Sequence, residues 1–169
     1  KCIIRDLNLI GEFKKDTVIL HEGAYAKECY FVLKGCVRCY YIIDGEEKTT
    51  EFYTERQAIT PISYITKKPS EYYLSCLEDS VLSLGTKNDM LIKMIPRLDT
   101  MIARFTSEML MDKQVSLDNF KNFSPEERYK ILLETRPDLI NRVPQYHLAT
   151  YLGITPVSLS RLRKRISRK

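Results

Sequence analysis

The sequence has no long hydrophobic run, although 44% of its 169 residues are hydrophobic. No uninterrupted apolar segment approaches the roughly 18–20 residues that a helix needs to cross a bilayer. The start of the sequence also lacks the basic segment and short apolar stretch that are typical of a secretion signal. We therefore expect a globular, cytoplasmic protein that makes no contact with a membrane.

Histidines and paired cysteine motifs are also scarce. His21 and His147 are the only histidines, whereas a metal-dependent enzyme on a jelly roll needs clustered histidine and carboxylate ligands. The five cysteines are odd in number and irregularly spaced, which indicates reduced thiols. "CVRC" (36–39) has the spacing of a zinc or dithiol motif, but on a strand residues i and i+3 point to opposite faces. We expect neither an enzyme nor a metal site, and a redox switch in addition to another function stays open.

Acidic residues are absent after Asp138. Residues 124–169 hold 10 lysines and arginines against 4 acids, whereas residues 1–123 hold 17 against 18. This asymmetry indicates a polyanionic partner for the last quarter of the chain. A merely solvated basic tail is the alternative that charge alone leaves open.

Residues 11–85 have the composition of β-structure. Short segments rich in Val, Ile, Tyr, Phe and Thr alternate with turn signals, and Asp44-Gly45 between two of them predicts a hairpin. The segments are "TVIL" (17–20), "CYFVLKG" (29–35), "VRCYYII" (37–43), "KTTEFY" (48–53), "YYLSCL" (72–77) and "SVLSL" (80–84). Many short strands at regular spacing predict a sandwich, jelly roll or barrel.

The periodicity changes near Thr86. Apolar residues then recur in the a/d pattern of a helical seam, and we expect a long helix from about Arg97 to Ser116 after a break at Pro96. This seam predicts a two-helix homodimer contact, and packing on the β-domain is the alternative. The seam residues assigned to the dimer are Leu98, Ile102, Phe105 and Met109.

A polar connector over residues 117–123 is the expected hinge to the last domain. Ser124 and Glu127 have the spacing of a capping box and Pro125 suits a first helical turn. A helix should therefore begin here, continue to about Arg136 and end before the next proline.

The segment "LATYLGITPVSLSRLRKR" (148–165) predicts two short helices. Gly153 suits the left-handed end of the first helix, and Thr155 can cap the second. Projected at 100° per residue, the second helix has a buried face and an open face. The buried face should hold Leu159, Leu162 and Ile166, and the open face Val157, Arg161, Lys164 and Arg168. Side chains of the second set are types that contact base edges and phosphates, so a DNA-binding helix-turn-helix is predicted, with a solvated helical hairpin as the alternative.

Taken in this order, the two halves resemble the Crp/Fnr family of bacterial transcription regulators. The motifs that carry the resemblance are "HEG" (21–23), "YFVLKGCVR" (30–38), "DGEEKTTEFY" (44–53) and "RVPQYHLATYLGITPVSLSRLRKR" (142–165). "ERY" (127–129) and "LGITPVSLSR" (152–161) are similar to Bacteroidetes-type members. The resemblance implies an α+β fold with an N-terminal double-stranded β-roll (jelly roll), a long dimerisation helix and a C-terminal, winged-helix-like helix-turn-helix domain. The expected divisions are a sensor at 1–86, a dimerisation region at 87–116, the hinge at 117–123 and the DNA-binding domain at 124–169.

The resemblance also implies roles for residues of the last domain. The residues expected to read bases are Val157, Ser160 and Arg161, and those expected to contact phosphates are Gln145, Thr155, Ser158 and Lys164. Pro156 and Val157 replace an arginine and a glutamate of the catabolite activator, so the target sequence should differ from that activator's. The partners implied are a pseudo-palindromic double-stranded DNA site, a second copy of the chain and RNA polymerase.

The effector is left open. The family's cyclic-nucleotide cassette has a Gly-Glu pair and a later arginine, whereas residues 55–76 have no glycine and no arginine after Arg56. Cyclic AMP binding by that cassette is therefore not expected, nor is an iron–sulfur or haem cofactor. Aromatic side chains either line a pocket for an unidentified small molecule or are plain core and strand-face residues: Tyr40, Tyr41, Phe52, Tyr53, Tyr64, Tyr72 and Tyr73. A regulatory module that acts through protein partners rather than DNA remains the alternative function.

Overall fold

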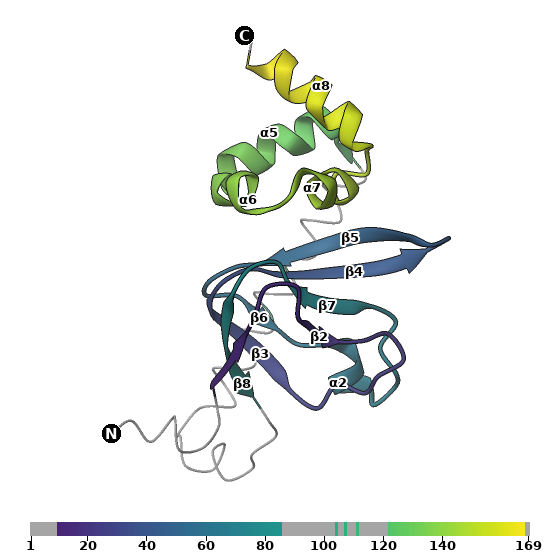
Figure 1. The fold of residues 1–169 in the computed structure, drawn as a ribbon, viewed down its shortest axis with the longest axis vertical. Helices are drawn as coiled ribbons and strands as arrows, with labels where there is room; N and C mark the ends of the chain where they lie inside the picture. Colours follow the sequence, from purple (N-terminus) through teal and green to yellow (C-terminus); the bar gives the residue numbers. More distant parts are fainter. Residues whose placement is uncertain (1–9, 86–103, 105–106, 108–110, 112–121, 168–169) are drawn as a thin grey trace.

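The computed structural model describes residues 10–85, 104, 107, 111 and 122–167. These residues form a β-domain and a helical domain, which lie one above the other (Figure 1). Arg104, Ser107 and Met111 are helical and exposed. The seam residues predicted for the dimer (Leu98, Ile102, Phe105 and Met109) lie outside the described residues, as does Arg168. No helix in the described part of the chain is both long and apolar enough to span a membrane.

Over residues 10–85 the β-domain consists of two four-stranded antiparallel sheets. Their strand orders are β1-β8-β3-β6 and β2-β7-β4-β5, so strands distant in sequence become neighbours, as in a jelly roll. The strands are β1 (Ile10–Phe13), β2 (Val18–Leu20), β3 (Cys29–Lys34), β4 (Val37–Ile43), β5 (Glu46–Tyr53), β6 (Ala58–Ile59), β7 (Tyr73–Cys76) and β8 (Ser80–Gly85). The predicted β-roll is thereby confirmed for the described residues.

The turns of the β-domain follow local conformational preferences. Asp44 and Gly45 both have positive φ angles, 53° and 78°, which is the geometry of the predicted β4–β5 hairpin turn. Gly35, between β3 and β4, has a φ of 107°, and a Cβ placed there would lie 2.2 Å from Ser80 Oγ. Only glycine fits this turn. The elements β1, β6 and α2 (Ile62–Thr66) were not predicted; β6 has only two residues and α2 is a short helix without a side-chain cap.

The two sheets enclose an apolar core between their inner faces. Its fully buried members include Val32, Leu74 and Leu82. Several of the predicted aromatic residues belong to this core or pack against it, namely Tyr41, Tyr53, Tyr64 and Tyr72. Tyr40 and Tyr73 instead stack on each other with ring centroids 5.1 Å apart. Cys39 belongs to the inner core whereas Cys36 packs with the helical domain, so the two cysteines of "CVRC" diverge as predicted.

Within residues 122–167 the structure describes these helices: α5 (Pro125–Thr135), α6 (Pro137–Arg142), α7 (Gln145–Tyr151) and α8 (Pro156–Ile166). The capping box at α5 is confirmed, since Ser124 and Glu127 bond each other's backbone N–H groups. The proline that ends α5 also begins α6, a short helix that the sequence interpretation missed. Residues 122–167 contain no strand, so the winged-helix-like part of the expectation has no counterpart there.

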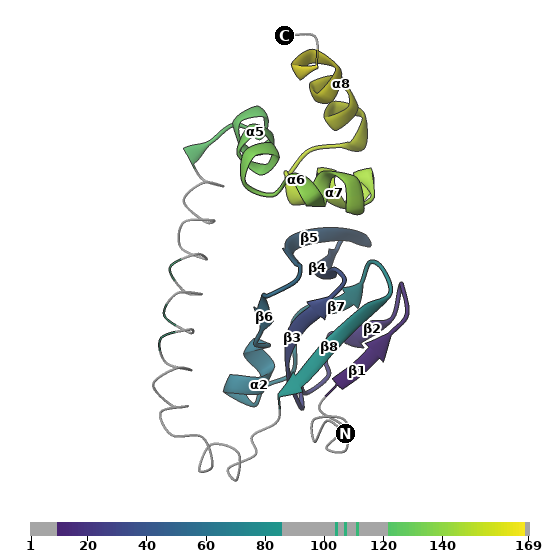
Figure 2. The ribbon, with the colours of Figure 1, turned by 90° about the vertical axis from the view of Figure 1, so that its left-hand side faces the viewer.

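The core of the helical domain continues onto the outer face of sheet β2-β7-β4-β5. Phe52 of β5 is fully buried and its ring lies 5.1 Å from that of Tyr151 in α7. Phe52 was expected to line a pocket or to be a core or strand-face residue; it is a strand-face residue that packs in one cluster with the helical domain, together with Cys36 and Leu77. Figure 2 shows α6 and α7 facing the β-domain and α8 on the far side of the helical domain.

Candidate nucleic-acid interface

The α7–α8 pair is held in one geometry by its turn and by its buried face. Gly153 has a φ of 71°, the left-handed conformation predicted for the end of the first helix. The hydroxyl of Thr155 accepts a hydrogen bond from Ser158 N at 3.2 Å, which confirms the predicted cap of α8. Leu159 and Leu162 are buried against the other helices. The remaining surface of α8 is therefore presented to solvent in a defined orientation.

The exposed face of α8 carries the residues predicted to read bases. Val157 is 60% exposed and Arg161 is exposed, whereas Ser160 is half-buried on the flank. An exposed β-branched side chain next to an exposed guanidinium is not explained by packing. Such a pair offers a contact for a thymine methyl group and a bidentate donor for guanine.

The residues predicted to contact phosphates lie on α7, on α8 and at the cap of α8. Gln145, Thr155, Ser158 and Lys164 are all exposed. The Thr155 hydroxyl donates to Ser158 Oγ at 2.9 Å, so it is engaged in the helix cap. The Ser158 hydroxyl keeps its own proton for an acceptor such as a phosphate oxygen.

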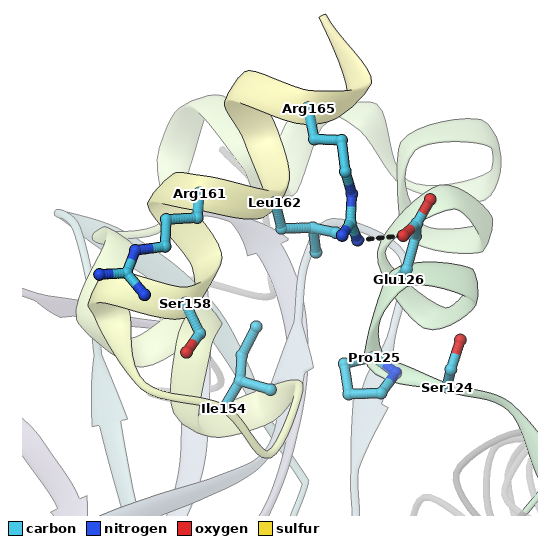
Figure 3. A pocket seen from close by; sticks show the side chains of 8 residues that line it. All are labelled: Ser124, Pro125, Glu126, Ile154, Ser158, Arg161, Leu162 and Arg165. Atoms are coloured by element: carbon cyan, nitrogen blue, oxygen red, sulfur yellow. Dashed lines mark hydrogen bonds and ion pairs between the residues drawn. The ribbon is translucent and has the colours of Figure 1, made fainter.

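A hollow of about 560 Å³ lies between α8 and the start of α5 (Figure 3). Its apolar floor includes Ile154 and Leu162. Arg165 extends from α8 toward α5 and pairs with Glu126, whereas Arg161 points away from α5. The sequence analysis did not distinguish Arg165 from the other cations near the end of the chain. It missed this ion pair because residues 39 positions apart give no local signal.

One face of α7 contacts the β-domain. Thr150 Oγ1 bonds Thr49 Oγ1 of β5 at 3.0 Å. His147 Nδ1 accepts a hydrogen bond from Arg38 of β4, and the Nη1 atom of Arg38 also contacts Glu47 Oε2 at 2.7 Å. His147, for which a structural or solvated position was expected, therefore joins the two domains.

Two arginines of the helical domain make further contacts with the β-domain. Arg136 donates to the carbonyl oxygen of Phe52 at 3.0 Å. Arg142 donates to both carboxylate oxygens of Glu55, at 2.8 and 2.9 Å, and also pairs with Glu78. This pairing lowers the pKa of Glu55 to about 2. The helical domain is thus held on the β-domain by three arginines around one apolar contact.

The family model for the cyclic nucleotide-binding domain matches residues 10–94, half of the chain. The chain belongs to the cyclic nucleotide-binding domain family. A comparison with curated protein sequences found no significant match.

Solved structures of similar fold contain this domain together with the helical part. FixK2 from Bradyrhizobium japonicum has a TM-score of 0.76 and 17% identity, with 94% of this chain and 84% of that chain covered. A CRP/FNR-family transcriptional regulator from Thermus thermophilus has a TM-score of 0.74 and 17% identity, with coverages of 94% and 86%. The c-di-GMP-responsive regulator CLP of Xanthomonas campestris gives 0.71 and 16%, with coverages of 98% and 90%. These likenesses show a shared fold.

In this cyclic nucleotide-binding domain, residues 55–76 form β6, the short helix α2 and β7. Lys67 ends α2 in the left-handed conformation, and its ammonium group lies 4.5 Å from the centre of the Tyr64 ring. Ser63 is buried and accepts a hydrogen bond from Ala26 N at 3.0 Å. The segment is therefore braced by internal contacts. Among the residues that the structure describes, no cluster of histidine, cysteine and carboxylate side chains could hold a metal ion.

Proposed function

We propose that the chain is a sequence-specific, DNA-binding transcription regulator of the Crp/Fnr type that acts as a homodimer, as in Bacteroidetes-type members. The observation that carries the proposal is the exposed face of α8. It combines Val157, Arg161 and Lys164 on a helix that contains no acidic residue and is fixed by a cap and a buried apolar face. A solvated surface helix would be expected to mix acids with these cations.

In this proposal α7 and α8 form a helix-turn-helix whose second helix enters the major groove. Val157, Ser160 and Arg161 contact bases. Gln145, Thr155, Ser158 and Lys164 contact phosphates. The solved structures of similar fold include a CRP/FNR-family transcriptional regulator from Thermus thermophilus, which supports the proposal.

The seam over residues 98–109 supplies the second copy that a pseudo-palindrome requires. Two recognition helices would then lie about 34 Å apart, one turn of DNA. The domain divisions at 86, 116 and 123 and the contact with RNA polymerase belong to the same proposal. An effector bound in the β-roll would act by changing the orientation of the helical domain.

Arg161→Ala should weaken binding to the cognate site about tenfold and relax the preference at one base pair, because a bidentate contact to guanine is lost. Lys164→Ala is the matched control: it should weaken binding to cognate and random DNA alike and reduce the salt dependence of binding by about one counterion. The measurement is fluorescence anisotropy with a fragment selected from genomic DNA, repeated at several salt concentrations. Equal losses on both DNAs for Arg161→Ala would assign that arginine to phosphate. Failure to select any fragment would favour a module that acts through protein partners.

A further inference from the structure

The contact between α7 and the β-domain is centred on a buried cation. Arg38 extends from β4 toward α7 and is only 4% exposed. Its guanidinium lies 3.8 Å from the centre of the Tyr40 ring. One nitrogen, Nη1, serves both Glu47 and His147, and Nε is buried with no hydrogen-bond partner among the residues that the structure describes. A cation buried at a domain contact depends strongly on its few acceptors.

The chemistry of this contact fixes the protonation state of His147. A guanidinium group has only donors, so the ring atom that faces Arg38 must be an unprotonated acceptor. The ring is therefore neutral and carries its proton on Nε2. Protonation of Nδ1 would remove the acceptor and place an imidazolium against the guanidinium in a half-buried position.

The groups around His147 act in opposite directions. Burial has the largest effect and the Arg38 charge the next largest, and both lower the pKa of His147 from its ordinary 6.5. Glu47 of β5 and Asp16 in the turn after β1 oppose this, but they do not prevail. The titratable and charged groups that act on the ring or contact it are Arg38 on β4, Glu47 on β5, Asp16, and Tyr146 on α7 itself, and Tyr40 of β4 lies against the Arg38 guanidinium.

The partner of His147 belongs to the other domain, and so do the partners of its helical neighbours. Thr150 bonds Thr49 of β5, and Tyr151 packs on Phe52 of β5. The candidate DNA-contacting residue Arg161 is exposed and belongs to α8, which lies on the far side of the helical domain from the β-domain (Figure 2). Protonation of His147 therefore affects the contact between the helical domain and the β-domain and not the exposed face of α8.

We propose that His147 is a pH-sensitive latch between the two domains: the neutral ring holds the helical domain on β4 and β5 through Arg38, and protonation releases it. Docking should be strongest above pH 6.5, where the free ring is also neutral. It should weaken as the pH falls below 6.5, by at most tenfold per pH unit for one bound proton. The effect of the latch on docking is independent of the proposed function. Only an effect of the latch on DNA binding would rest on the proposed function.

The experiment is an NMR pH titration of the full chain. The chain has two histidines, so two ring signals are expected, and the variant His21→Asn assigns them. Docking is read from the contact between the Phe52 and Tyr151 rings, whose centroids lie 5.1 Å apart. In the wild type this contact should be present at pH 7.5 and at least threefold weaker at pH 5.5. In His147→Gln, whose amide oxygen can accept from Arg38 but cannot be protonated, it should persist at pH 5.5.

A second variant separates charge from size. His147→Lys places a permanent cation beside Arg38 and should weaken the ring contact at both pH values. The proposal is overturned if the wild-type contact survives complete protonation of His147, or if wild type and His147→Gln lose it in parallel. Contacts within the helical core must persist at pH 5.5, and their loss together with the ring contact would also overturn the latch. DNA binding at pH 7.5 is measured separately, so a failure of the proposed function does not affect this result.

Discussion

Phe52→Ala is expected to lower the free energy of unfolding by about 3–5 kcal/mol, the usual cost of truncating a fully buried phenylalanine. The loss should be at the upper end because the ring fills a contact between two domains. On one side lies sheet β2-β7-β4-β5, and on the other lie Tyr151 and the helical core. Neither side can collapse into the cavity without moving the whole helical domain. Urea denaturation followed by circular dichroism measures the loss.

The matched control is Phe31→Ala on β3. Phe31 is half-buried and lies in the other sheet, so its truncation should cost less and leave the domain contact intact. Hydrogen exchange over α7 distinguishes the two variants: it should rise in Phe52→Ala and stay unchanged in Phe31→Ala. Equal stability losses with unchanged exchange in both would show that the helical domain is not seated on Phe52.

Much of the β-domain could be predicted from sequence, because its longer strands combine β-branched and aromatic residues with strong turns. Asp44-Gly45 is one such turn. Both residues tolerate a positive φ angle at little steric cost, and this turn therefore fixes the β4–β5 hairpin. Helices α5 and α8 could be predicted from their caps for a similar reason. The two-residue strand β6 and the short helix α2, which has no side-chain cap, offer no comparable pattern.

The candidate DNA-contacting face was predictable because helical geometry alone places Val157 and Arg161 opposite Leu159. The contacts between the domains were not. Phe52 reads as an ordinary strand residue, and nothing local shows that its side chain faces a helix from another domain. Arg38 reads as an exposed strand cation, yet tertiary packing buries it against α7. Pairings more than 80 residues apart, such as Phe52 with Arg136, leave no periodic trace.

Arg142→Ala should lower the free energy of unfolding by about 2–3 kcal/mol near neutral pH. Arg142 makes a bidentate hydrogen bond to Glu55 and also pairs with Glu78. Its removal would leave these two carboxylates without their shared cation. The side chain of Glu55 is 40% exposed and that of Arg142 is 24% exposed. Solvent screening therefore places the loss above that of a surface pair and below that of a fully buried one.

The pH dependence of this loss separates charge from packing. The pKa of Glu55 is lowered from 4.5 to about 2, chiefly by Arg142, so the pair stabilises the fold fully above pH 4.5 and loses this effect as the pH falls toward 2. The difference in unfolding free energy between wild type and Arg142→Ala should accordingly shrink at pH 3, and the pKa of Glu55 in the variant should return toward 4.5. Arg142→Lys keeps the charge but not the bidentate geometry of the guanidinium, so the pKa of Glu55 in this variant should be lowered only in part. A difference of equal size at pH 7 and pH 3 would mean that Arg142 stabilises the domain contact by packing alone.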